Sequence, residues 1–155
     1  MKPIFKLFTA LLAGLVSHAE LALGCRAEYG EQVTVPGFTA AASLNHHQYG
    51  VVRLASATTV NICSETGVSS ATAAPFGILQ NKPYVDEAAS VCIFGLSKVF
   101  GGGTVTAGAY ITYDSSGHVV NANSGDMVIG RALQTLATAG EKGLALIFPP
   151  IRWAV

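Results

Sequence analysis

Charged side chains are scarce in this sequence. Lys, Arg, Asp and Glu make up 12% of the 155 residues, and nine basic residues balance nine acidic ones. A chain without net charge has no long-range basic field to attract nucleic acid, so we expect no direct binding to DNA or RNA. Because 50% of the residues are hydrophobic and few are charged, we expect an apolar and neutral surface. Such a surface is better suited to lasting contact with other subunits than to an isolated protein in solution.

Cysteine is also rare, and its three positions are far apart. Cys25, Cys63 and Cys92 form no CxxC pair, and no histidine is spaced from them as a zinc partner would be. An odd count argues against a disulfide framework. We therefore expect reduced thiols that behave as small hydrophobic side chains, above all Cys92, which lies within an apolar run.

Residue patterns typical of catalysis are missing as well. No serine lies in a GxSxG sequence, and the glycines at 101–103 lack the Lys and Ser/Thr that a phosphate-binding loop requires. His46 and His47 are adjacent, so on a strand they would point to opposite faces and bind a metal poorly. Asp86 and Glu87 are adjacent rather than facing, which makes a poor acid/base pair. We expect no enzyme activity, no catalytic residues, no cofactor and no metal.

What the sequence does contain is a series of short β-forming runs, beginning near Gln48. β-branched and aromatic residues fill the runs, and Gly, Pro, Asp and Ser fill the gaps. Eight to ten short strands at this spacing predict an all-β fold, a small barrel or sandwich. The expected strands are 49–54, 58–63, 76–80, 91–94, 96–100, 110–113, 118–120, 127–136 and 144–148.

Several breaks between these runs carry specific expectations. Gly95 separates two strands, and Pro149 with Pro150 ends the last one, leaving an apolar tail from Ile151 that carries the only Trp. Asp114 to Gly117 predicts a β-turn in which the aspartate accepts hydrogen bonds from the backbone and the glycine adopts a positive φ.

The first residues allow two interpretations. As a secretory signal, residues 1–19 offer two lysines, an apolar stretch and a plausible cleavage site. As a retained arm, they carry an apolar stripe at helical spacing, too short and interrupted for a membrane span. The sequence slightly favours the signal, but the chain still begins at Met1, which a mature secreted protein would have lost. We therefore expect a retained arm.

The expected organisation has three parts. Residues 1–27 form the arm, residues 28–47 a linker with a short strand at 33–35, and residues 48–155 a β-rich domain. The stripe is too large to leave in water, because burying each such side chain is worth about 1.5–3 kcal/mol.

Four segments together resemble the tailed-phage capsid cement, or head decoration, proteins. Residues 75–83 (PFGILQNKP) resemble a strand and turn of that family, and residues 90–98 resemble its following pair of short strands. Residues 106–117 resemble its hairpin, and residues 127–132 (MVIGRA) its late strand. Each motif is weak alone, but their order and spacing are moderately specific. The resemblance covers residues 49–148.

This resemblance implies a structural protein of the virion that binds the outer surface of an assembled phage head and stabilises the capsid shell. Its implied partners are the major capsid protein and itself, as a homotrimer, with no nucleic acid and no membrane in the mature particle. It would be made in the host cytoplasm, consistent with unpaired cysteines. The alternative is a secreted bacterial surface or adhesin-like β-domain with a cleaved signal peptide.

Ten residues are the expected contacts with the capsid or with another subunit. Six belong to the apolar stripe of the arm, and four lie at the end of the central strand and in the glycine loop that follows it. They are Ile4, Phe8, Leu11, Leu12, Leu15, Val16, Phe100, Gly101, Gly102 and Gly103.

Overall fold

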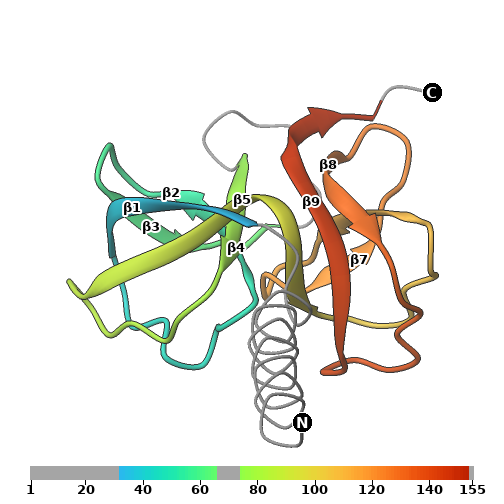
Figure 1. The fold of residues 1–155 in the computed structure, drawn as a ribbon, viewed down its shortest axis with the longest axis horizontal. Coiled ribbons are helices and arrows are strands. Elements are labelled where there is room, and N and C mark those ends of the chain that lie inside the picture. The colour runs from blue at the N-terminus through green and yellow to red at the C-terminus, as the bar shows by residue number, and fades with distance from the viewer. Residues whose placement is uncertain (1–31, 66–73, 154–155) are drawn as a thin grey trace, which may run out of the picture. The chain divides into compact units, whose positions relative to one another are not determined.

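The computed structural model describes residues 32–65 and 74–153 (Figure 1). The expected arm with its stripe, Cys25 and most of the loop between the second and third predicted strands lie outside these ranges.

The strands are β1 (Gln32–Ala40), β2 (Val51–Leu54), β3 (Thr59–Ile62), β4 (Pro75–Leu79), β5 (Ala88–Phe100), β6 (Tyr110–Tyr113), β7 (Val119–Asn121), β8 (Met127–Ala132) and β9 (Lys142–Arg152). Nine strands and no helix in the described ranges confirm the all-β prediction, and among these residues no helix could span a membrane.

Five of the strands form a closed barrel. Their order is β1-β3-β2-β4-β5, and β1 pairs again with β5 to close the ring. Only the β1–β3 pairing is parallel within this ring. Beyond β5 the sheet continues through β9, β8, β6 and β7. A single bridge between Gly101 and Val119 then links the last of these strands back to the chain just after β5.

Strand β5 belongs to both parts of the fold. Its first half pairs with β1 and β4, and its second half pairs with β9. In Figure 1 the blue and green strands lie on one side of β5, and the orange and red strands lie on the other. The expected break at Gly95 is wrong. Gly95 pairs with Gln32 of β1 and with Ile147 of β9, so hydrogen-bond partners on both edges keep one strand continuous where two were predicted.

The wall between the two parts is buried on both faces. Successive residues of a strand point to opposite sides, and in β2, β4 and β5 both members of a neighbouring pair are buried. One member of each pair faces the barrel core, and the other faces a second, central core. The pairs, barrel side first, are Val52 and Val51, Leu79 and Ile78, and Val91 and Cys92.

The two cores fill the two parts of the sheet. The barrel core consists of Ala40, Leu44, Val52, Val60, Leu79, Ala89 and Val91. The central core consists of Val51, Cys63, Ile78, Cys92, Val99, Val105, Ile111, Tyr113, Val119, Ile129, Ala132, Leu136, Ala145 and Ile147. Burial of apolar surface on this scale is the main favourable contribution to folding.

The final strand also differs from the prediction. Pro149 and Pro150 do not end it, because β9 continues to Arg152. The register changes here: Gly130 pairs with Ile147, but Val128 pairs with Ile151. The extra residues of β9 form a bulge, where a missing backbone N–H removes no ladder hydrogen bond.

Two further strands differ from their predicted extents. Strand β8 ends at Ala132 rather than continuing to residue 136, because the chain leaves the ladder and Leu136 pairs instead with Val105 in a separate bridge. The short strand expected at residues 33–35 is present and longer: β1 covers residues 32–40 of the segment assigned to the linker, and its pairing with β5 closes the barrel.

Close packing of β4 against β5 leads to the first prediction. A Cβ atom at Gly77 would lie against the backbone oxygen of Cys92 and 2.7 Å from a methyl group of Val91. Gly77→Ala should therefore lower the free energy of unfolding by about 1–3 kcal/mol, the usual cost of overpacking a core. Denaturant unfolding measures this cost. Gly103→Ala is the control, since nothing lies within 4 Å of that position, and equal stability of the two variants would contradict the packing argument.

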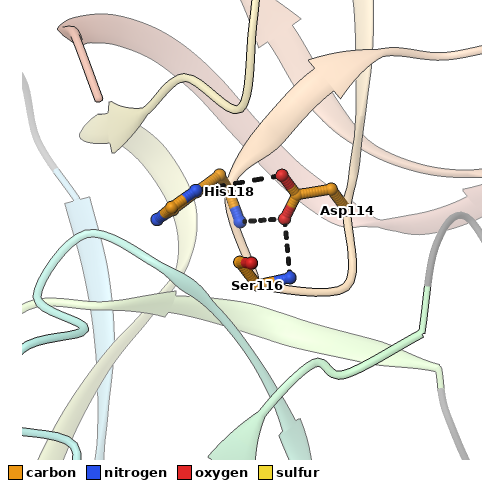
Figure 2. A network of polar contacts seen from close by, with 3 residues as sticks. All are labelled: Asp114, Ser116 and His118. Atoms are coloured by element: carbon orange, nitrogen blue, oxygen red, sulfur yellow. Dashed lines mark hydrogen bonds and ion pairs between the residues drawn. The ribbon is translucent and has the colours of Figure 1, made fainter. Parts of the chain in front are cut away.

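The turn between β6 and β7 has the geometry that the sequence predicted. Oδ1 of Asp114 accepts hydrogen bonds from the backbone N–H of Ser116 at 2.8 Å and of His118 at 2.9 Å (Figure 2). The backbone N–H of Gly117 donates to the carbonyl of Asp114 at 3.0 Å, and the φ of Gly117 is 73°. The aspartate and the glycine thus fix the turn.

Gly117 is constrained by its surroundings as well as by its φ. A side chain there would meet Ile62 of β3 and lie 3.0 Å from the carbonyl of Val51. Gly117→Val should cost about 1–2 kcal/mol for the backbone alone, and more because of the contact with Ile62. Gly140→Val is a matched control, because Gly140 has a φ of 82° and open space around it. We expect the melting temperature to fall further for Gly117→Val than for Gly140→Val. Equal decreases would show that the strained φ alone accounts for the lost stability and that the contact with Ile62 adds nothing.

Candidate functional site

A Ser, a His and an Asp meet in the turn of Figure 2, but their contacts are those of a turn. Ser116 contributes its backbone N–H to Asp114, and the carboxylate also accepts from the backbone of His118. The imidazole Nδ1 of His118 is 3.8 Å from Oδ2 of Asp114. A hydrolase would need the serine hydroxyl bonded to the imidazole, and here the aspartate orders the backbone instead.

The adjacent histidines expected to bind a metal poorly lie just before β2. His46 is exposed and His47 is half-buried. Burial lowers the pKa of His47, and the neighbouring His118 and His46 lower it further, so this imidazole is neutral near pH 7. In the part of the chain that the structure describes, His, Cys, Asp and Glu form no group of three that could hold a metal.

Two of the three cysteines lie in the central core as free thiols. Cys63 and Cys92 are buried and unpaired with each other, which confirms for these two the prediction of small, reduced hydrophobic side chains. Burial raises the pKa of Cys63 to about 12, although Arg53 opposes the shift. Burial raises the pKa of Cys92 as well.

These raised pKa values predict poor thiol reactivity in the native protein. The thiolate is the nucleophile, and a pKa raised above its ordinary value leaves both groups protonated at pH 8. Iodoacetamide at pH 8 should leave Cys63 and Cys92 unmodified in the folded chain and label both after unfolding in guanidinium. Peptide mass spectrometry resolves each site. Rapid labelling of either thiol in the native protein would show that its core position opens readily.

The sheet beyond β5 has an exposed face directed away from the central core. Its strands place Tyr110, Arg131, Leu146 and Leu96 opposite one another in a single row across β6, β8, β9 and β5. We call this row the outer face. Tyr110 is 39% exposed and Leu146 38% exposed, whereas Ala132 and Ala145, one residue further along β8 and β9, are buried in the central core. Large apolar side chains therefore meet solvent on one side of this sheet.

A pocket of about 210 Å³ adjoins one end of the outer face. It is lined by Tyr110, Val128, Ile151, Arg152 and Trp153. The rings of Tyr110 and Trp153 lie 5.5 Å apart with a tilt of 59° between their planes. Val128 is 1% exposed and Ile151 54% exposed. We call this the aromatic pocket.

Backbone hydrogen bonds and a cation hold the walls of the aromatic pocket in place. The backbone N–H of Trp153 donates to the carbonyl of Asp126 at 2.9 Å, and its carbonyl accepts from Gly125 at 2.7 Å. Arg131 donates from Nε to the carbonyl of Gly108 at 2.7 Å, and its guanidinium lies 5.1 Å from the centre of the Tyr110 ring. The tyrosine ring thus contacts both an arginine and a tryptophan.

Arg152 differs from Arg131 in having no side-chain partner in the part of the chain that the structure describes. Among the described residues its guanidinium makes no hydrogen bond or ion pair, and the residue is exposed. No acidic side chain lines the pocket. The neighbouring Asp126 accepts a hydrogen bond from the backbone N–H of Asn123 at 2.7 Å, which closes a local turn. Among the described residues, the charge of Arg152 is therefore unpaired beside two aromatic rings.

The predicted contact residues fall in different surroundings. Phe100 pairs with Lys142 at the far end of β5. Its ring lies near His118 and the Lys142 ammonium, and the residue is half-buried. Gly101 is buried, whereas Gly102 and Gly103 are partly exposed in the loop. The six stripe residues of the arm lie outside the described ranges.

Sequence reasoning missed the outer face and the aromatic pocket. The one signal was the apolar tail carrying the only Trp, and its first three residues prove to line the pocket. Tyr110 and Val128 belong to predicted strands, but nothing local shows that these strands bring their side chains to residues 151–153.

Comparison with known proteins gives a likeness of fold only. No family model and no curated protein matches the chain. Among solved structures, the N base of the head fiber gp8.5 of bacteriophage phi29 is similar, with a TM-score of 0.55 and 14% sequence identity. The match covers 76% of this chain and 94% of that chain. This all-β fold therefore also occurs in a phage head fiber protein. The sequence resemblance likewise pointed to proteins of phage heads.

Proposed function

We propose that this chain is a structural protein of a phage virion that binds the outer surface of the assembled head. The carrying observation is the likeness of fold to the head fiber base of bacteriophage phi29, across nearly the whole of that chain. The ordered motifs within residues 49–148 point to head decoration proteins on separate grounds. Both lines lead to a protein attached to a phage head rather than to an enzyme.

The surface chemistry supports this role. Large side chains of the outer face and its margins are exposed, with Leu133 at 46% and Ile151 at 54%. An exposed apolar patch in a chain with few charges is typical of a surface that another protein covers. Its area removed from water would supply about 25 cal/mol per Å² before the costs of association.

In more detail, we propose that the chain acts as a cement protein of the capsid. Three copies would assemble where capsid subunits meet and stabilise the expanded shell. A trimer that engages several subunits converts weak single contacts into lasting attachment. The stripe in the arm, from Ile4 to Val16, would add contacts to a neighbouring copy or to the capsid, and the loop from Phe100 to Gly103 would lie near the three-fold contact.

Decoration of empty heads tests the proposal. Purified chain mixed with undecorated heads of the phage that encodes it should bind to saturation, raise the temperature at which the heads open, and appear as three-fold knobs by electron microscopy. Absence of the chain from sedimented heads would refute head binding. Single isolated copies at each site would refute the trimer while leaving head binding intact.

The arm is tested in the same assay. Leu11→Asp with Leu15→Asp should reduce occupancy and leave the melting temperature of the β-domain unchanged, because the charges enter only the stripe. The matched control is Leu54→Asp with Val85→Asp, two exposed apolar positions of the barrel part. Equal occupancy of the arm variant and the wild type would exclude the stripe from the contact.

The secreted surface protein is the second candidate, since residues 1–19 have the features of a signal peptide. Mass spectrometry of the chain isolated from particles separates the two. A first residue at Met1 supports the retained arm, whereas a first residue near Glu20 shows that the segment was cleaved.

A further inference from the structure

We propose that the aromatic pocket binds a carboxylate attached to an apolar group, presented by the head surface as an apolar side chain next to an acidic residue. The identity of the partner rests on the proposed function. The chemistry of the ligand rests on the pocket itself, lined by Tyr110, Val128, Ile151, Arg152 and Trp153.

The size and lining of the pocket select the apolar half of the ligand. A volume of about 210 Å³ lies below the roughly 300–1,000 Å³ of pockets that enclose drug-sized molecules, so it fits a single side chain. Tyr110 and Trp153 present two tilted rings, and an incoming ring or branched alkyl group can pack against both. Val128 and Ile151 add aliphatic surface.

The charge distribution selects the anionic half. Arg152 is the unpartnered guanidinium among the lining residues, and a guanidinium matches a carboxylate with two parallel hydrogen bonds. The guanidinium of Arg131 lies over the ring of Tyr110, 5.1 Å from its centre, and adds a second positive charge near the site. The nearby carboxylate of Asp126, which accepts a hydrogen bond from the backbone N–H of Asn123, offsets only one of these two positive charges. In a chain of zero net charge, this local excess attracts an acidic group.

Two features favour a protein segment over a small free molecule. Tyr110 belongs both to the pocket and to the row Tyr110, Arg131, Leu146 and Leu96, so the pocket adjoins the exposed outer face. A bound segment that continues along this row would cover Leu146. The pocket walls are also held before binding by the hydrogen bonds of Trp153 and the stacking of Arg131 on Tyr110, which lowers the ordering cost of association.

The ligand class can be tested without phage heads, because Trp153 is the only Trp of the chain and its fluorescence reports on the pocket. The probe is phenylacetate, with 2-phenylethanol as its neutral counterpart of similar size. Phenylacetate should change the emission saturably in the millimolar range. Arg152→Gln should weaken phenylacetate binding at least about fivefold, as expected for loss of charge-assisted hydrogen bonds at an exposed site, and should leave 2-phenylethanol unaffected.

Arg53→Gln is the control for the loss of an arginine, since Arg53 lies on β2 and outside the pocket. Its affinity for phenylacetate should equal that of the wild type. Melting curves of both variants verify the fold. Equal affinity of the wild type for phenylacetate and 2-phenylethanol, or no effect of Arg152→Gln, would overturn the assignment of a carboxylate.

The partner is tested in the head-binding assay. Arg152→Glu should lower occupancy on undecorated heads about tenfold or more, Trp153→Ala should lower it as well, and Arg53→Glu should not. Excess phenylacetate should compete with the heads for wild-type chain. Normal occupancy of Arg152→Glu would overturn the pocket as a head contact. If the wild type binds phenylacetate through Arg152 but binds no heads, the proposed function fails and the ligand class stands.

Discussion

The fold depends on a wall of strands that is buried on both faces. In β2, β4 and the first half of β5, neighbouring residues such as Ile78 and Leu79 point into different cores. Removing the wall would expose the barrel core and the central core together, so neither part has a complete interior without it. Within the wall, Gly77 of β4 must lack a side chain, because a Cβ atom there would clash with the backbone of Cys92 and the side chain of Val91 in β5.

The exposed surfaces follow from this arrangement. Strands β6, β8 and β9 direct one face at the central core, and on the opposite face Tyr110, Arg131 and Leu146 meet solvent. The barrel strands curl around their own core, and the sheet beyond β5 offers the outer face. A protein that attaches to a large assembly needs such a rigid face, because ordering a flexible one would cost conformational entropy on binding.

The aromatic pocket shows how strand ends create a site without a sequence motif. Tyr110 begins β6, Val128 lies near the start of β8, Ile151 and Arg152 end β9, and Trp153 follows directly. Antiparallel pairing of β8 with β9, and of β8 with β6, brings these positions together. The bulge at Pro149 and Pro150 extends β9 far enough to carry Ile151 and Arg152 to the pocket, so the prolines that were expected to end the strand lie within it instead.

Local chemistry in the sequence determined the strand-rich class, most strand positions and the turn at Asp114 to Gly117, because β-propensity and turn geometry act over a few residues. It also indicated unpaired, core-like cysteines. Only the tertiary structure decided that Gly95 continues a strand, that β1 closes a barrel, and that Tyr110 meets Trp153. Those outcomes depend on hydrogen bonds and packing between residues far apart in the chain, and strand order and register are invisible in any single run of residues.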